Sequence, residues 1–397
     1  MQTPTRFQAR LALAAAMFAA FALPARADAI TDWNIKTGEL IAEAKLGTPP
    51  AIRVMAIVQT AASQAANASA QRSAEAAVAA AHRVALMKLM PAQQASIDAA
   101  YQAALAPMPD GPGKNAGVAA GEKAALEVLA QRADDGAAAT EAYRPHTAPG
   151  AYVPTAAPAV PQWAQRKPWL MAGAAQFRPG PPPALASERW ARDYNEVKDV
   201  GGKASTRRST EQTHIARFWE YSLPAIYHGV VRSVALQPGR DLAGNARLFA
   251  AVAQAMDDAM ISVFDAKYHY NFWRPSTAIR NGDIDGNDAT QREASWAPML
   301  DAPMHPDYPS GHAVLASALS TAPTAEAGDR PMPGLATSSP SAKGAVRSWV
   351  SVDDFVKEVS DSRVYAGIHF RSATDAGASM GRWIGELAAA RLLQASH

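Results

Sequence analysis

Residues 309–322 read PSGHAVLASALSTA, a short polar start followed by a run of small and aliphatic residues typical of a buried helix. Ser310 is a natural N-cap for this helix, because its side-chain oxygen can accept a hydrogen bond from the first turn. The amides of Gly311 and His312 then lie at a helix N-terminus, where free N–H groups and the macrodipole favour an anion. His312 extends from the first turn and can act as a general acid or base near neutral pH.

A second polar cluster lies upstream at residues 267–275, which read KYHYNFWRP. Lys267 and Arg274 are seven residues apart, and at about 100° per residue a continuous helix brings them to within about 20° of one face. The aromatic residues between them indicate a helix buried nearly all round, and buried cations require an anionic partner. We therefore expect both cations to reach the same anion, with Pro275 ending or kinking the helix.

The third cluster is the stretch 362–369, which reads SRVYAGIH. Arg363 and His369 are six residues apart, about 240° around a regular helix, so they do not share a helical face. Gly367 predicts a bend that turns both side chains inward. Together the three clusters provide one lysine, two arginines, a serine, a glycine amide and two histidines. Such a set offers several donors to the oxygens of a phosphate-sized oxyanion and a reactive group on its axis.

Composition limits the classes of protein to which this chain can belong. Of its 397 residues, 48% are apolar and 19% are charged, which permits a sizeable core and argues against general disorder. The net charge of +2 gives no indication of a basic surface, so we expect no nucleic-acid partner. The absence of cysteine excludes a disulfide framework, a thiolate nucleophile and a thiolate metal site.

Residues 1–27 have the pattern of a secretory signal peptide. Arg6 and Arg10 form a basic start, residues 11–23 are apolar, and Ala25-Arg26-Ala27 provides a small-x-small cleavage site. An uncleaved anchor is the alternative, although the apolar run is short for a bilayer span. No other apolar run reaches that length, so we expect a periplasmic or secreted protein without a transmembrane segment in the mature chain.

The remaining chain divides by composition into three parts. Residues 28–146 are Ala-rich and helical, residues 147–183 form a Pro/Gly-rich connection, and residues 184–397 form a helical core. Aromatic residues in the connection indicate that it packs on the surface, with a flexible linker between independent domains as the alternative. The predicted fold class is all-α, with helical bundles around a buried oxyanion site. The expected helices of the core span residues 211–227, 245–273, a stretch after 310, 351–365 and 373–393.

The three clusters match the pattern K-x6-R-P, P-S-G-H and S-R-x5-H in order and in spacing. In this the chain resembles the superfamily of vanadium-dependent haloperoxidases and type 2 phosphatidic acid phosphatases, in particular its secreted bacterial haloperoxidase-like branch. The resemblance covers residues 207–391 and implies an all-α fold with the site at the bundle core. It also implies that the oxyanion oxygens are held by Lys267, Arg274, Ser310, the Gly311 amide and Arg363.

For a haloperoxidase, the resemblance implies vanadate as the cofactor and His369 as its axial metal ligand. His312 would deprotonate hydrogen peroxide and protonate the departing oxygen, and Lys267 would polarise the bound peroxide for attack by halide. The hypohalous acid so formed would then meet a small organic acceptor. For a phosphatase, the same resemblance implies that His369 attacks phosphorus to give a phosphohistidine, and that His312 protonates the leaving alcohol.

Two features favour the haloperoxidase. Family phosphatases commonly carry an acid four residues after the last histidine, whereas this chain has Ala373 there and its next acid is Asp375. His305, in the stretch MHPDY before PSGH, stands where bromoperoxidase-type members carry a second histidine near the halide. A loop histidine that faces solvent is the alternative interpretation of His305.

The sequence therefore predicts a vanadium-dependent haloperoxidase-like enzyme that oxidises halide, with bromide favoured, by means of hydrogen peroxide. The first alternative is a soluble secreted acid phosphatase that hydrolyses phosphomonoesters. An alternative of another class is a periplasmic oxyanion-binding protein without turnover, against which the presence of both His312 and His369 counts.

Overall fold

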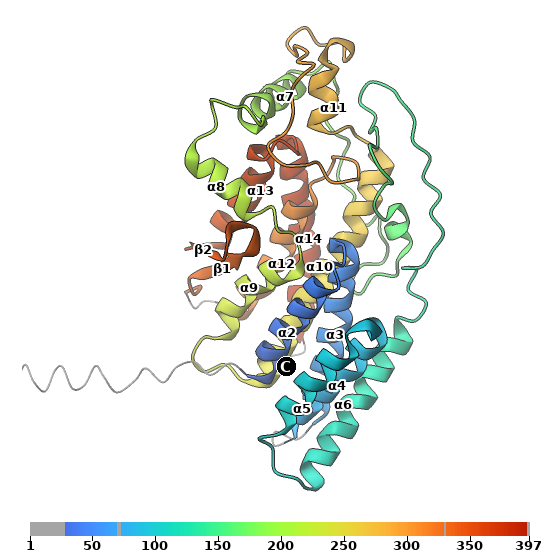
Figure 1. Ribbon diagram of the computed structural model, residues 1–397, viewed down its shortest axis with the longest axis vertical. Coiled ribbons are helices and arrows are strands. Elements are labelled where there is room, and N and C mark those ends of the chain that lie inside the picture. The colour runs from blue at the N-terminus through green and yellow to red at the C-terminus, as the bar shows by residue number, and fades with distance from the viewer. Residues whose placement is uncertain (1–27, 70–72, 329–330, 395–397) are drawn as a thin grey trace, which may run out of the picture.

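The computed structural model describes residues 28–69, 73–328 and 331–394, and its fold is all-α, which confirms the predicted class (Figure 1). The signal peptide predicted for residues 1–27 lies outside the described residues. The helices are α2 (Ala29–Glu43), α3 (Thr48–Ala68), α4 (Ala74–Leu89), α5 (Gln94–Leu105), α6 (Pro112–Gln131), α7 (Glu188–Gly201), α8 (Thr210–Phe218), α9 (Pro224–Ala235), α10 (Leu242–Tyr270), α11 (Pro275–Arg280), α12 (Gly311–Ala327), α13 (Val352–Tyr365) and α14 (Arg371–Gln394). Strands β1 (Leu335–Ser339) and β2 (Ala345–Trp349) form one antiparallel hairpin. No described helix has the length and hydropathy to cross a bilayer.

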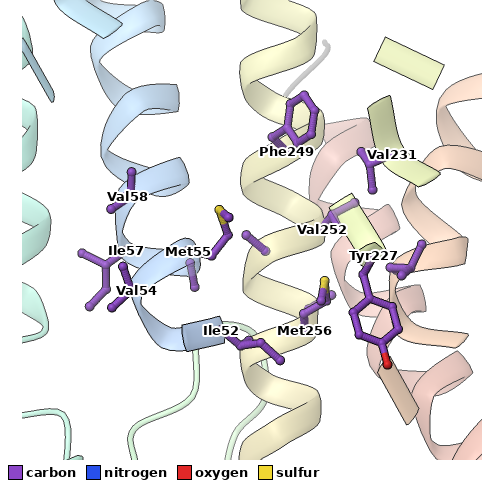
Figure 2. Packing of buried hydrophobic residues seen from close by; sticks show 14 of the residues in the cluster. Ile52, Val54, Met55, Ile57, Val58, Tyr227, Val231, Phe249, Val252 and Met256 are labelled. Carbon is purple, nitrogen blue, oxygen red and sulfur yellow. The ribbon is translucent and has the colours of Figure 1, made fainter. Parts of the chain in front are cut away.

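Helix α10 is the centre of the molecule, with α3 on one side and α12 and α14 on the other (Figure 1). A single apolar cluster runs through these helices. Figure 2 shows Ile52 and Met55 of α3 facing α10, while Tyr227 and Val231 of α9 lie across α10 from them. The Ala-rich helices and the C-terminal helices therefore share one core.

The connection between α6 and α7 runs along one side of the molecule (Figure 1). Its single regular element is the short 3-10 helix η2 (Pro161–Gln165), in a stretch that is described without a gap. Two adjacent acids of α10 bind it: Asp258 accepts hydrogen bonds from the amides of residues 169–171, and Asp257 pairs with the buried Arg166. These buried contacts hold the connection onto α10, because each one would leave an unpaired charge if it opened.

Two of the expected helix boundaries are wrong. The helix expected over residues 211–227 is divided into α8 and α9, because Pro224 lacks the N–H that a continuous helix requires and instead starts α9. The helix expected over residues 245–273 ends at Tyr270, where Asn271 takes a left-handed conformation with φ 47°. Asparagine tolerates this conformation and can end a helix as glycine does.

Helices α12 and α14 approach each other through three glycines of α14. A Cβ atom added at Gly377, Gly381 or Gly385 would lie 2.7, 2.3 or 2.6 Å from a backbone carbonyl oxygen of Ser310 or of helix α12. No carbon atom fits at such distances, so only glycine lets the two backbones lie against each other. The amide of Ser310 also donates to the Ala373 carbonyl at 2.8 Å. This contact fixes where the starts of the two helices lie.

We expect Gly381→Ala to destabilise the protein by about 1–3 kcal/mol or more, because the added methyl group meets the Val314 carbonyl. Urea unfolding measures this difference. Gly113→Ala is the matched control: Gly113 lies in α6, and its added Cβ meets no described atom within 4 Å. This control should be neutral or more stable by about 0.5–1 kcal/mol. If both variants gain stability equally, the close packing of α12 on α14 is wrong.

Candidate functional site

The three polar clusters meet where the end of α10, the start of α12 and the turn between α13 and α14 come together. Five of their charged and polar side chains are at most 3% exposed, namely Lys267, Arg274, Ser310, Arg363 and His369, while His312 is half-buried. Three cations buried this completely must be compensated by carbonyl groups, by a carboxylate or by a bound anion. Within the described chain, carbonyl groups and a carboxylate contact these cations.

The Lys267 ammonium holds the loop that precedes α12. It donates to the carbonyls of Pro306, Asp307 and Pro309 at 2.9, 2.9 and 2.5 Å. Burial, and then the charge of Arg274, lowers the pKa of Lys267 well below its usual value. All three donors of the ammonium are engaged with backbone, so a contact with an anion requires that one of them be exchanged.

Arg274 lies near Lys267, but it comes from a different element than the expected helix. It does not lie on α10, because that helix ends before it; it is the N-cap residue of α11, with extended backbone. The prediction that Lys267 and Arg274 share a helical face is therefore wrong, although the two cations do converge. The guanidinium of Arg274 donates to the carbonyl of His305 at 2.9 Å and to that of Ile368 at 2.7 Å. It thus joins two loops of the site.

His369 lies between a cation and a carboxylate. Its Nε2 is 3.3 Å from Arg274, and its Nδ1 is 2.8 Å from Oδ1 of Asp307. The ring and the carboxylate are close but are not aligned as a regular hydrogen bond. Gly367, with φ 76°, makes the bend between α13 and α14, as the sequence predicts. This bend lets His369 and Arg363 both point inward.

Asp307 is the residue that sequence reasoning missed. The expected place for an acidic partner of His369 is four residues further along the chain, but this position is Ala373 and the next acid is Asp375. The side chain of Asp375 is 57% exposed and lies 3.9 Å from Arg189. Asp307 instead comes from the loop before α12 and is fully buried. The absence of an acid four residues after His369 therefore does not exclude a His–Asp pair, because the acid comes from another segment. The available signal in the sequence was the position of Asp307, three residues before Ser310.

The start of α12 presents polar atoms that lack partners. Ser310 occupies the N-cap position, but its side chain makes no capping bond, contrary to expectation. Its Oγ, Nε2 of His312 and Nε of Arg363 are buried and have no hydrogen-bond partner among the described residues. A buried polar atom left unpaired costs about 1–3 kcal/mol, so a group of them at one place indicates a ligand site. Hydroxyl, imidazole and guanidinium groups together fit a tetrahedral oxyanion.

The carbonyl of Trp219 holds Arg363, whose NH1 donates to it. Burial and the charge of Arg363 lower the pKa of His312, and the Trp219 backbone opposes this lowering in part. Nε2 of His312 is buried without a partner within the described chain, so this ring atom remains available to a ligand.

Burial and positive charge keep the histidines of the site neutral. Burial is the largest cause that lowers the pKa of His305, His312 and His369 well below the usual value. The next causes are the charges of Lys267 for His305, Arg363 for His312 and Arg274 for His369. Burial also raises the pKa of Asp307 to about 7, against the opposing effects of Arg274 and Lys267. Against the three buried cations Lys267, Arg274 and Arg363, the described site thus sets one carboxylate, that of Asp307.

His305 lies beside Arg274 and is half-buried. Its Nδ1 is 2.9 Å from NH2 of Arg274, and its ring meets Phe264 edge-on with centroids 5.2 Å apart. The structure therefore brings His305 to the same group of side chains as the three clusters, and the alternative of a loop histidine pointing into solvent does not describe this arrangement.

Known proteins share this architecture. A family model described as "VCPO second helical-bundle domain" matches residues 247–396, which hold all three clusters. Vanadium chloroperoxidase of Curvularia inaequalis is 33% identical over 139 residues, and this match covers 29% of the present chain and 22% of that relative. The matched stretch thus spans less than a quarter of the relative's length.

Two solved structures resemble nearly the whole chain. The first is described as the first bacterial vanadium-dependent iodoperoxidase, with 26% identity, a TM-score of 0.76 and coverage of 90% of this chain and 95% of that one. The second is a holo-type bacterial vanadium-dependent chloroperoxidase, with 19% identity, a TM-score of 0.72 and coverage of 88% and 93%. The second likeness concerns the fold alone.

Anion binding at this site should take up protons. An anion beside His312 and His369 favours their charged forms and raises their lowered pKa values, so binding strengthens as the pH falls from 8 to 6. For each proton taken up, the limit is about tenfold in Kd per pH unit. Sulfate is the suitable probe because it stays a dianion throughout this range, and calorimetry in buffers of different ionisation enthalpy counts the protons.

The matched pair for this measurement is His312→Gln and His82→Gln. Both histidines have their pKa lowered by burial, but His82 stacks on Trp33 in the N-terminal helices. The first change should reduce the proton uptake and the second should leave it unchanged. Sulfate binding without any dependence on pH would contradict the proposed neutral state of the site histidines.

Proposed function

Because the chain belongs to the superfamily of vanadium-dependent haloperoxidases and type 2 phosphatidic acid phosphatases, we propose that it is a haloperoxidase-like enzyme that uses hydrogen peroxide to oxidise halide at a bound vanadate. The single observation that carries the proposal is the group of buried, unpartnered atoms of Ser310, His312 and Arg363 beside His369, within the described residues. The likeness of nearly the whole chain to a bacterial vanadium-dependent iodoperoxidase supports the haloperoxidase branch.

The residues present fit vanadate. His369 would hold it through Nε2, since Asp307 faces Nδ1. The oxygens would be held by Arg274, Arg363, Ser310 and the Gly311 amide, whose charges and free donors suit an anion. The chemistry that vanadate supplies when bound is the transfer of one peroxide oxygen to halide.

His312 handles the protons in this proposal. Its Nε2 has no partner within the described chain and burial lowers its pKa, so it is a neutral base that accepts a proton from hydrogen peroxide as the peroxide binds. The resulting imidazolium then returns the proton to the departing oxygen.

Lys267 and His305 have different places in the proposal. Lys267 positions the loop before α12 through three carbonyls, and its charge would polarise bound peroxide only after exchange of one of these bonds. His305, with Arg274 on one side and Phe264 on the other, lies at the halide side, with bromide as the favoured ion. A small organic acceptor would take up the oxidised halogen. A periplasmic or secreted location rests on the signal-like residues 1–27.

One observation favours a phosphatase as the second candidate. The contact between His369 and Asp307 is the pair that a phosphohistidine mechanism requires, because the carboxylate orients the ring and stabilises its charge. The substrate would then be a phosphomonoester. A binding protein without turnover is less favoured, since retention of an anion alone gives no role to the free base at His312.

The deciding experiment compares two activities of one preparation. We expect the purified protein to brominate a phenolic dye with hydrogen peroxide only after orthovanadate is added, because the oxygen transfer resides in that group. Hydrolysis of p-nitrophenyl phosphate, measured without vanadate, should be weak by comparison. Hydrolysis without vanadate combined with no bromination at any vanadate concentration would overturn the haloperoxidase in favour of the phosphatase.

Variants assign the residues within the same assay. His369→Ala should lower either activity by at least about 10²-fold, since it removes the side chain that would hold vanadate or attack phosphorus. His305→Ala should lower bromination while the Kd for vanadate changes little. His214→Ala is the matched control: this side chain is 65% exposed on α8, and the change should leave both activities intact. Full activity of the His369 variant would show that the site assignment is wrong.

A further inference from the structure

The phenol of Tyr227 is a buried polar group beside the site that the mechanism above does not use. It belongs to α9, is completely buried, and its hydroxyl has no hydrogen-bond partner within the described chain. Its sequence context, PAIYHGVV, gives no sign of a site residue, since an aromatic on an apolar helix face is usually core. A buried hydroxyl without a partner, however, carries a desolvation cost that a phenylalanine at the same position would not.

The hydroxyl points out of the apolar core. Figure 2 shows the Tyr227 ring near Met256 of α10, with its oxygen directed away from Phe249 and Val252 and toward the C-terminal end of α10. That end carries Lys267. The ring thus fills core space as phenylalanine would, while the oxygen is the part that faces the site.

The rings of His312 and Trp219 lie next to this phenol. The ring meets that of His312 edge-on, with centroids 6.3 Å apart, and the ring of Trp219 lies 6.0 Å away by the same measure. Burial raises the pKa of Tyr227, and the positive charge of Arg363 opposes this rise, which places Arg363 within electrostatic reach. The phenol therefore remains protonated at physiological pH and is available as a donor.

Other buried polar atoms at this end of the bundle also lack a hydrogen-bond partner within the described chain. Nε2 of His312, Nε of Arg363 and Oγ of Ser310 are buried at the same end of the bundle and, like the phenol, are unpaired within the described chain. The phenol, the serine hydroxyl and the guanidinium can each donate to one anion with several oxygens, and His312 can do so once it is protonated. We propose that the Tyr227 hydroxyl is a further hydrogen-bond donor to the bound oxyanion, on the side of His312 and Arg363. This inference rests on the proposed oxyanion site but not on the identity of its occupant.

The test uses inorganic phosphate and two tyrosine variants. Tyr227→Phe should weaken phosphate binding about tenfold or more in calorimetry, as expected for loss of a hydrogen bond to a charged group. Without phosphate, the same variant should melt at the wild-type temperature or above it, because it removes an unpaired buried hydroxyl. A merely structural tyrosine would not give this combination.

Tyr194→Phe is the matched control. Tyr194 is equally buried, but its hydroxyl donates to the Gln291 carbonyl at 2.8 Å. This variant should lose stability and keep the wild-type affinity for phosphate. If Tyr227→Phe binds phosphate as tightly as the wild type, the inference is overturned.

A second measurement does not depend on the variant folding. Phosphate added to the wild-type protein should produce a tyrosine signal in the ultraviolet difference spectrum that saturates with the calorimetric Kd, and no such signal would count against the inference. Neither measurement involves peroxide or halide. A protein that fails to brominate but shows both effects leaves the role of Tyr227 in place and overturns only the haloperoxidase.

Discussion

The close contact between α12 and α14 is the constraint on which the rest of the site depends. Three glycines of α14 let its backbone rest on the carbonyls of α12, and the amide of Ser310 bonds to the Ala373 carbonyl. The start of α12 carries the serine and histidine of PSGH, and the turn before α14 carries His369. Because both helix starts are fixed by this one contact, small changes in it would move His369 relative to Ser310 and His312. Function here therefore depends on residues that have no side chain.

The cations of the site also hold it together. Lys267 and Arg274 bond to carbonyls of the loop before α12, and Arg274 joins that loop to the turn at Ile368. Burial, and after it these charges, lowers the pKa of His305 and His369, and the cations give the site an excess of positive charge. An oxyanion would compensate this excess, and by charge and shape the proposed site suits phosphate and vanadate alike. Shape and charge therefore do not distinguish a phosphatase from a haloperoxidase. In the proposal, the distinction lies in the chemistry at His369 and in the residues around His305.

Sequence reasoning succeeded where the controlling interactions are local. The apolar run after PSGH predicts a helix, Gly367 predicts a bend, and scarce strand alternation predicts an all-α fold, since each depends on neighbouring residues. It failed at Arg274 because a helix pattern continues through Asn271, whereas the backbone there turns left-handed. It failed at Asp307 because spacing along one helix cannot reveal a partner from another segment. The sequence also contains no indication of a role for Tyr227, because a tyrosine on an apolar helix face has the same pattern whether its hydroxyl faces a site or the core.

The most direct test of the central claim is a crystal structure of the protein grown with orthovanadate. The account predicts vanadium bonded to a ring nitrogen of His369, with its oxygens contacted by Ser310, Arg274 and Arg363 and the His312 ring nearby. It also predicts that Nδ1 of His369 still faces Asp307. Vanadate bound elsewhere, or bound at this place without a bond to His369, would contradict the claim that these three sequence clusters form one oxyanion site with a histidine on its axis.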